Sequence, residues 1–319
     1  MQNQALSSII DDRSAKAQEK STLPFWLSSI SSLPELDVFY DAEAKTLWQY
    51  MKPLGRPSFT PGLIRDCTAV INAVELSHRT AQDETSQQVQ YMILSSRIAG
   101  IYNLGGDLAR FQKMIEARDR EGLRHYAHSC VEAQYRRAIR MNLPICTVAL
   151  VQGDALGGGF EVALSHDIII AEKQAKFGLP EILFNLFPGM GAYSFLSRRL
   201  DSARATRLMT SGRLYCAEEM YEMGIVDILA DDGDGADAAI GFIEQHRRAG
   251  KARMAIAKLR EMVTPISRQE LIDITDLWVE TALSLDARDL RKMGHLVAAQ
   301  NRRVPEPDAG ETGVRRARA

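Results

Sequence analysis

The chain has 319 residues, a formal net charge of −2, 45% apolar residues and 25% charged residues. This length allows one large domain with an appendage or two smaller domains, with enough apolar residues for a sizeable core. The near-neutral charge excludes the basic surface that is typical of nucleic-acid binding, and no apolar run reaches the ~18–20 residues of a membrane span. The N-terminal segment lacks the apolar centre of a secretory signal, so we expect a cytoplasmic protein with no membrane span and no nucleic-acid partner.

Four cysteines are scattered along the chain without a CxxC pair and without histidines at a zinc-binding spacing. This pattern predicts neither a disulfide framework nor a metal site, and we expect no cofactor. Free thiols are typical of a reducing compartment, which agrees with the cytoplasmic location.

The two ends of the chain differ in composition from the middle. Residues 1–35 are rich in serine, glutamine and charge, which predicts an N-terminal extension that is not itself a domain. Residues 301–319 contain two prolines, two glycines and five arginines, which predicts a mobile basic tail. Between them we expect a core at 36–240 and a helical region at 241–300.

Within the core, apolar runs of strand length alternate with helical patterns, which predicts an α/β fold. Strands are predicted at residues 47–51, 89–96, 145–152 and 167–171, and helices at 61–76, 108–117 and 118–140. The run TVALV at 147–151 suits a strand that is buried on both faces and ends before Gly153.

The C-terminal third becomes helical. Helices at 203–212 and 217–224 precede a short predicted strand at 225–229. Ser267 to Glu270 form a capping-box pattern, after which a helical apolar stripe follows. Its members are Leu271, Ile274, Trp278, Ala282 and Leu285. Such a stripe must pack either on the core of its own chain or on another subunit, and the sequence leaves both open.

Four glycine-bearing loops, each leading into a helix, are the candidates for chemistry. They lie at residues 103–108, 157–161, 178–182 and 187–192. Glycines let a backbone approach a ligand closely, and the first N–H groups of a helix are free to donate to a negative oxygen. The sequence has neither the GK[ST] of a phosphate loop nor the GxGxxG of a dinucleotide site here, so phosphate binding is the weaker interpretation.

Two of these loops carry a glutamate in an apolar setting, Glu161 and Glu181. Burial of a carboxylate is costly unless the group is paired or protonated. Two such carboxyl groups in different environments have separated pKa values, which suits paired acid–base catalysis. Taken singly, a glutamate in such a setting is more often a satisfied structural carboxylate than a catalytic one.

Taken together, LGGD at 104–107, GGGFE at 157–161 and GLPE at 178–181 resemble the signature of the crotonase, or enoyl-CoA hydratase/isomerase, superfamily. The resemblance covers about residues 40–235. It implies a crotonase-like spiral of ββα units for the core, followed by C-terminal helices that support a homotrimer or hexamer.

The resemblance also implies roles for individual residues. The backbone N–H groups of Gly106 and Gly158 would form an oxyanion hole for a thioester carbonyl. The neighbouring substrate-binding positions would be Leu104, Gly105 and Gly157. Glu161 and Glu181 match the two catalytic glutamates of the hydratases. We assign Glu181 to the proton on the α-carbon and Glu161 to the hydroxyl group or water.

A closer resemblance, within this superfamily, is to the bacterial diffusible signal factor synthases. It is carried by ALVQGDALGGGFE at 149–161, FNLFPGMGAYSF at 184–195 and ITDLWVETA at 274–282. It implies dehydration of a medium-chain 3-hydroxyacyl thioester on acyl carrier protein. Hydrolysis would then release a free cis-2-unsaturated fatty acid, a quorum-sensing signal. Where typical hydratases place a lysine for CoA, this chain has Ala109, which argues against CoA and is compatible with acyl carrier protein. Arg110 follows and could replace that lysine, so CoA stays open as a carrier.

The apolar residues beside these motifs are candidates to line an acyl tunnel, although for each one taken singly core packing is the commoner role, because apolar residues are usually buried. They are Leu143, Leu183, Leu186, Phe187, Met190 and Phe195. Two other functions stay open. The chain could be a plain enoyl-CoA hydratase of fatty-acid metabolism, or a regulatory protein of the same fold that docks to a sensor kinase.

Overall fold

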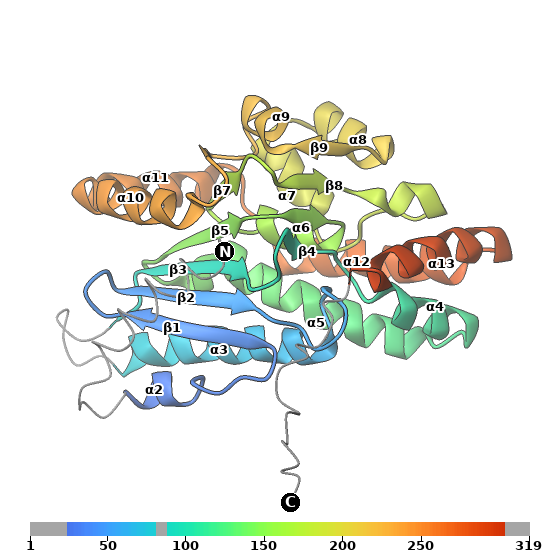
Figure 1. Cartoon of the computed structure of the whole chain (residues 1–319), viewed down its shortest axis with the longest axis horizontal. Helices are drawn as coiled ribbons and strands as arrows, with labels where there is room; N and C mark the ends of the chain where they lie inside the picture. Colours follow the sequence, from blue (N-terminus) through green and yellow to red (C-terminus); the bar gives the residue numbers. More distant parts are fainter. Residues whose placement is uncertain (1–23, 81–87, 304–319) are drawn as a thin grey trace, which may run out of the picture.

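The structure is a computed structural model that describes residues 24–80 and 88–303. The predicted extension at 1–35 lies outside the described residues up to residue 23, and the predicted tail at 301–319 lies outside them from residue 304. Both therefore stay predictions, as do the domain boundaries. The α/β class is confirmed, because two sheets and their covering helices make up the described chain (Figure 1).

The larger sheet has six strands in the order β1-β2-β3-β5-β7-β10. These strands are β1 (Leu36–Asp41), β2 (Thr46–Met51), β3 (Tyr91–Ser96), β5 (Cys146–Val151), β7 (Ile168–Glu172) and β10 (Ile228–Ala230). Strand β1 is antiparallel to β2, and all other neighbours are parallel. A parallel sheet needs covering elements on both faces, which agrees with the continuous apolar run in β5.

The smaller sheet has four strands in the order β4-β6-β8-β9. These are β4 (Ile101–Asn103), β6 (Asp154–Leu156), β8 (Lys176–Gly178) and β9 (Leu214–Cys216). The pairs β3/β4, β5/β6 and β7/β8 each place their first strand in the larger sheet and their second in the smaller one. Each pair is followed by helices, so the expected spiral of ββα units is confirmed.

The helices of this part of the chain lie between and after the strands. After β2 comes α3 (Pro61–Arg79), and after β4 come α4 (Leu108–Glu116) and α5 (Arg120–Ala138), which a short turn η1 (Arg140–Asn142) ends. After β6 comes α6 (Gly158–Leu164). After β8 come η2 (Pro180–Phe184), α7 (Ala192–Arg199) and α8 (Ser202–Ser211), and α9 (Ala217–Glu222) follows β9. A short helix α2 (Phe25–Ser28) precedes β1.

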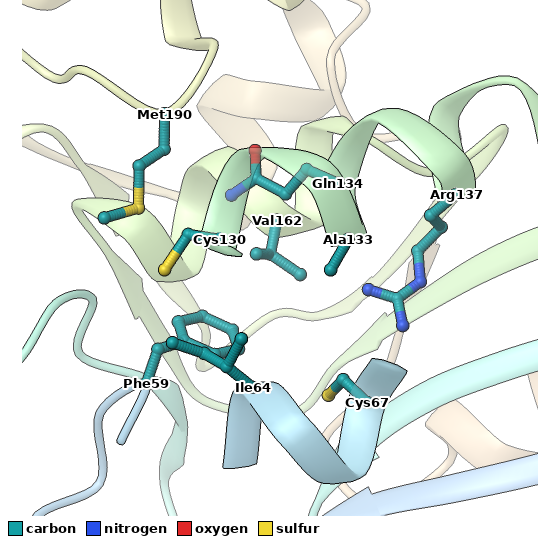
Figure 2. A pocket seen from close by; sticks show the side chains of 9 residues that line it. All are labelled: Phe59, Ile64, Cys67, Cys130, Ala133, Gln134, Arg137, Val162 and Met190. Atoms are coloured by element: carbon teal, nitrogen blue, oxygen red, sulfur yellow. The ribbon is translucent and has the colours of Figure 1, made fainter. Parts of the chain in front are cut away.

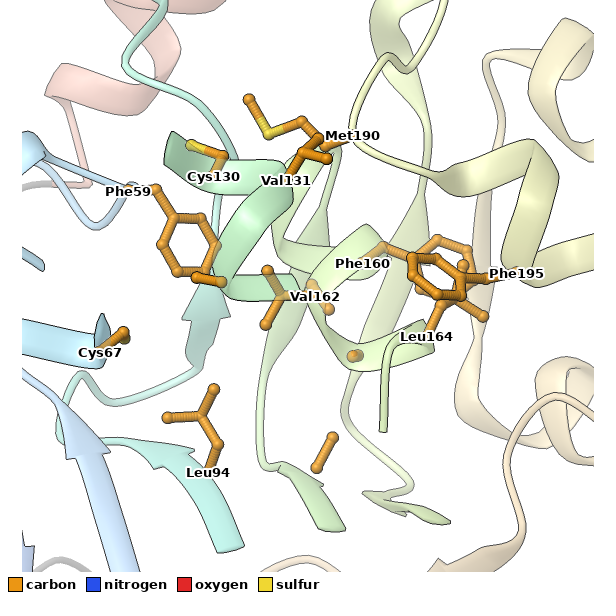
Figure 3. Close-up of a cluster of buried hydrophobic side chains, with 14 of the residues drawn as sticks. Phe59, Cys67, Leu94, Cys130, Val131, Phe160, Val162, Leu164, Met190 and Phe195 are labelled. Atoms are coloured by element: carbon orange, nitrogen blue, oxygen red, sulfur yellow. The ribbon is translucent and has the colours of Figure 1, made fainter. Parts of the chain in front are cut away.

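Strand β5 illustrates why the core forms as it does. All six of its residues are buried, as the sequence predicted. Ala149 and Val151 face the main cluster, while Val148 and Leu150 face a second cluster on the other side of the sheet, covered by Phe242. Figure 3 shows part of the main cluster, to which Phe160 and Phe195 belong.

Four helices close the chain at its C-terminal side. They are α10 (Gly235–Arg248), α11 (Gly250–Val263), α12 (Arg268–Leu283) and α13 (Ala287–Asn301). Ser267 caps α12 by accepting a hydrogen bond from the Glu270 N–H at 3.0 Å, as predicted. The Trp278 ring lies 5.1 Å from the Phe111 ring and is 4% exposed, so the stripe of α12 packs on its own chain. Across the described ranges, no helix has the length and apolarity needed to cross a membrane.

One predicted strand is displaced. The sequence predicted a strand at 225–229, whereas β10 occupies Ile228–Ala230. The N–H groups of Ile225 and Val226 both donate to the Met220 carbonyl oxygen, which ends helix α9. These residues therefore complete the helix end, and the strand begins after them.

Candidate active site

Glu161 lies in the first turn of α6, directly after the glycine run that ends strand β6. The residue is 1% exposed. Its Oε1 atom accepts hydrogen bonds from the backbone N–H groups of Met190 at 2.8 Å and Ala192 at 3.0 Å. Burial raises the pKa of Glu161 to about 7, although the two N–H donors favour the charged form. The group therefore titrates near neutral pH.

The two donors to Glu161 come from the fourth glycine loop, which the sequence suggested only as a pocket wall. Gly191 caps helix α7 with a φ of +106°, a conformation that glycine adopts without strain. This turn aims the N–H groups of Met190 and Ala192 at the carboxylate. Backbone donors have no side-chain signature, so only the glycines of GMGA at 189–192 indicated a special backbone here.

Glu181 lies in η2, directly after Pro180. Its Oε1 atom lies against Gly157, where a Cβ atom would stand 2.6 Å from it. Its Oε2 atom is buried, and no hydrogen-bond partner for it occurs in the part of the chain that the structure describes. Burial, and after it the charge of Glu161, raises the pKa of Glu181 to about 8. The two carboxyl groups therefore influence each other and titrate within the same pH range.

The first and second glycine loops lie side by side. A Cβ atom on Gly105 would stand 2.9 Å from the Gly158 nitrogen, and one on Gly158 would stand 3.4 Å from the Gly106 nitrogen. Gly158 is the first residue of α6, so its N–H has no acceptor within the helix. Within residues 24–80 and 88–303, no acceptor is found for the Gly106 N–H. Two free donors thus meet beside the carboxyl groups.

The first loop is held in place from both sides. The Asn103 side chain accepts a hydrogen bond from the Gly105 N–H at 2.8 Å. Leu104 is buried, its N–H donates to the Pro57 carbonyl at 2.8 Å, and its carbonyl oxygen accepts from the Gln300 side chain of α13 at 3.0 Å. The structure therefore brings the predicted backbone and carboxyl groups into one region. They are Leu104, Gly105, Gly106, Gly157, Gly158, Glu161 and Glu181.

The six apolar residues predicted for an acyl tunnel do not share one pocket. Met190 lines an enclosed cavity beside Glu161, whereas Phe195 lines a separate, more open cleft. Leu186 is buried in the core, and Leu143 and Phe187 are half-buried against it. Leu183 is 50% exposed. Of these six residues, only Met190 both donates a hydrogen bond to Glu161 and lines a cavity.

The enclosed cavity is shown in Figure 2. Its lining residues are Phe59, Ile64, Cys67, Cys130, Ala133, Gln134, Arg137, Val162 and Met190. Its volume is about 20 Å³, which is room for one water molecule. An acyl chain can enter only if side chains move, and Met190 is suited to this because its side chain is long and unbranched.

The described residues contain no group of three or more side chains that could hold a metal ion. The four cysteines are free thiols. The chemistry that this site offers consists of two titrating carboxyl groups beside two backbone donors. That combination suits proton transfer next to a carbonyl whose oxygen becomes negative.

Known proteins resemble this chain in sequence. A protein-family model described as enoyl-CoA hydratase/isomerase matches residues 53–301. The mitochondrial methylglutaconyl-CoA hydratase of Rattus norvegicus is 28% identical over 215 residues, which are 64% of this chain and 61% of that protein. The mitochondrial enoyl-CoA hydratase domain-containing protein 2 of Homo sapiens is 30% identical over 189 residues, 58% of this chain and 60% of that protein. The chain thus spans about three fifths of the length of these curated relatives.

Solved structures share the fold. An enoyl-CoA hydratase from Bacillus anthracis has a TM-score of 0.61 at 20% identity and covers 85% of this chain and 98% of its own. DspI of Pseudomonas aeruginosa has a TM-score of 0.58 at 23% identity and covers 73% of this chain and 89% of its own. The matched family region contains both glutamates and all four glycine loops. The chain therefore belongs to the enoyl-CoA hydratase/isomerase family, the crotonase superfamily.

Proposed function

We propose that this chain is a lyase that removes water from a 3-hydroxyacyl thioester and then hydrolyses the thioester to release a cis-2-unsaturated fatty acid. Such a product is a diffusible quorum-sensing signal. The observation that carries the proposal is the pair of carboxyl groups, Glu161 and Glu181, whose pKa values are raised to about 7 and about 8 beside two free backbone donors. The reaction requires no metal and no cofactor.

The backbone donors act on the thioester carbonyl. The N–H groups of Gly106 and Gly158 donate to its oxygen and stabilise the negative charge that develops when the α-proton leaves. Because these donors are fixed by the loops, they need no reorganisation during the reaction, and removal of one such donor typically costs about 10²–10³ in rate.

The carboxyl groups then move two protons. Glu181 accepts the proton from the α-carbon, and Glu161 donates a proton to the β-hydroxyl group, which leaves as water. The pair must carry one proton for this step, so the rate is expected to rise and fall with pH around pH 7–8, the region in which both groups titrate. In the second step, one glutamate takes a proton from a water molecule, which attacks the carbonyl carbon in the same oxyanion hole. The C–S bond then breaks, and the thiol of the carrier leaves with that proton.

We propose acyl carrier protein as the carrier of the substrate. Ala109 and Arg110 form the first turn of α4, directly after the oxyanion loop. The alanine offers no charge to a CoA phosphate. Arg110 is exposed and its backbone N–H is bound by Asp107, so its side chain is free to meet an acidic carrier.

A plain enoyl-CoA hydratase is the second candidate. Hydration needs the one proton that the pair carries to be on Glu181 instead of Glu161. Hydration starts from this form, because Glu161 then activates water and Glu181 protonates the α-carbon. The relatives named as hydratases support the same reaction class.

Docking to a sensor kinase is a third proposal. If docking were the whole function, we would expect signal production to continue when both glutamates are replaced by alanine.

The test uses purified protein with a 3-hydroxyacyl carrier protein and, separately, with the matching CoA thioester. Mass spectrometry of the products is expected to show a free cis-2-enoic acid, formed faster from the carrier protein. An enoyl thioester without free acid would overturn the synthase proposal in favour of the hydratase. Glu161→Gln and Glu181→Gln should each abolish dehydration, whereas Glu222→Gln, an exposed glutamate of α9, is the matched control.

A further inference from the structure

We propose that the enclosed cavity beside Met190 receives the far end of the acyl chain, and that Arg137 and Gln134 bind a carboxylate there. The inference rests on the proposed function, because it assumes that an acyl thioester binds beside Glu161. It narrows the substrate class of that function to acyl chains with a second carboxylate at the end remote from the thioester, so that the released acid carries two carboxylates.

The first observation is an unpaired buried cation. Arg137, near the end of α5, is 2% exposed. Its guanidinium contacts the Cys67 thiol, but its Nε and Nη2 atoms are buried, and the described chain offers them no acceptor. Arg140, three residues later, forms ion pairs with Asp167 and Glu261. A buried guanidinium without an anion is strongly disfavoured, so Arg137 calls for a negative partner from outside the chain.

The second observation is an unpaired amide on the same wall. Gln134 is one turn before Arg137 on α5 and is also 2% exposed. Neither its Oε1 nor its Nε2 atom has a partner among the residues that the structure describes. The amide NH₂ and the guanidinium are both donors, and a carboxylate accepts several hydrogen bonds at once. In Figure 2 both side chains border the cavity, with Arg137 at the opposite side from Met190.

The cavity is connected to the catalytic pair through its other walls. Val162 follows Glu161 in α6, and the Met190 N–H donates to Glu161. The Met190 sulfur also lies 3.4 Å from where a Cβ atom on Gly158 would stand. Met190 therefore lies between the oxyanion loop and the cavity, and Arg137 lies on the opposite side of the cavity.

The wall between these two ends is apolar. Phe59, Ile64 and Ala133 lie along it, and they suit the methylene groups of a short chain. A chain that ended in a methyl group would leave the guanidinium buried without an anion. A chain that ended in a carboxylate would satisfy both Arg137 and Gln134. The small volume of the cavity requires Met190 to move when the chain enters.

The experiment compares two six-carbon 3-hydroxyacyl CoA thioesters, one ending in a carboxylate and the other in a methyl group. For the wild-type protein, kcat/KM is expected to be about 10–100-fold higher with the carboxylate, the range that a charge-assisted hydrogen bond provides. In Arg137→Met the ratio of the two kcat/KM values should fall by a similar factor, and in Gln134→Leu by less. Arg136→Met is the control, because Arg136 pairs with Glu75 of α3 and does not line the cavity. A ratio near one in the wild type, or a ratio unchanged in Arg137→Met, overturns the inference.

Titration calorimetry with the same two thioesters separates this inference from the proposed function. Tighter binding of the carboxylate-ended thioester, without turnover of either acyl group from CoA or from acyl carrier protein, would support the polar end of the cavity and overturn the lyase. Turnover of both thioesters with equal affinity would support the lyase and overturn the inference. If Arg137→Met does not fold, Gln134→Leu and the wild-type comparison still decide the question.

Discussion

At the scale of single residues, the site depends on how two carboxyl groups lose contact with water. Glu161 keeps two backbone donors, whereas no donor for the Oε2 atom of Glu181 occurs in the described chain. Burial therefore raises the pKa of both groups, and the charge of Glu161 raises that of Glu181 further, to about 8 against about 7. An acid–base pair needs one proton to be held and one to be accepted near neutral pH, and two coupled carboxyl groups that titrate in this range carry one shared proton there.

The raised pKa values also make the stability of the fold depend on pH. Each carboxyl group titrates near 4.5 in the unfolded chain, so between pH 4.5 and about 8 the folded protein binds more protons than the unfolded chain. The contribution of these two groups to the free energy of unfolding is therefore fully present below pH 4.5 and is lost as the pH rises through this window. We expect Glu181→Gln to be more stable than the wild type by about 1–3 kcal/mol at pH 8, with a smaller difference at pH 5. Urea unfolding at the two pH values measures this, and an equal difference at both would contradict it.

Gly157 offers a sharper test of how closely the site is packed. Its φ is +51°, and a Cβ atom there would stand 2.6 Å from the Glu181 Oε1 atom. Gly157→Ala should displace this carboxyl group and lower the dehydration rate about 10²-fold or more, because a small misplacement of a catalytic group is costly. Gly224 is the matched control: its φ is +80°, but nothing lies within 4 Å of a Cβ atom there.

Both alanine variants carry the backbone strain of a positive φ, about 1–3 kcal/mol in stability. The added methyl group contacts the Glu181 carboxyl group in Gly157→Ala, whereas in Gly224→Ala it contacts nothing within 4 Å. Kinetic assays on the 3-hydroxyacyl thioester, together with thermal unfolding, therefore separate strain from displacement. Equal losses of activity in Gly157→Ala and Gly224→Ala would show that Glu181 does not depend on its contact with Gly157.

At the scale of helices and strands, the sequence predicted the elements whose pattern is long enough to read. Helix α3 begins at the predicted residue, and β5 has the predicted burial on both faces. Strands β4, β6 and β8 have three residues each and were not predicted, because so short a run has no visible periodicity. Yet β4, β6 and β8 lead into the loops of the candidate site.

The same limit applies to the site. Glu161, Glu181 and the glycine loops could be predicted because their residue types and order are distinctive. The donors to Glu161 could not, since every residue except proline has a backbone N–H. The unpaired state of Arg137 could not be predicted either, because α5 contains several arginines and only tertiary packing decides which one is buried. Trp278 likewise needed the structure to show that it packs against Phe111 of its own chain.

At the scale of the whole molecule, helix α11 differs from the other C-terminal helices. It has no buried residue, and four of its apolar side chains are more than half exposed. These are Ile256, Leu259, Met262 and Val263. Clustered apolar exposure of this kind marks a contact surface more often than a solvent-facing helix. Together with the trimers that the family resemblance implies, it leads to a prediction about assembly.

We expect the protein to form a homotrimer or hexamer in which α11 is covered by another subunit. Light scattering should then give three or six times the mass of one 35.5 kDa chain. The double variant Met262→Glu with Val263→Glu should shift the mass toward the single chain, because charges cannot be buried there without partners. Tyr221→Glu, a substitution of a half-exposed aromatic residue on α9, should leave the mass unchanged. A single-chain mass for the wild type, or an unchanged oligomer in the α11 variant, would mean that this helix faces solvent.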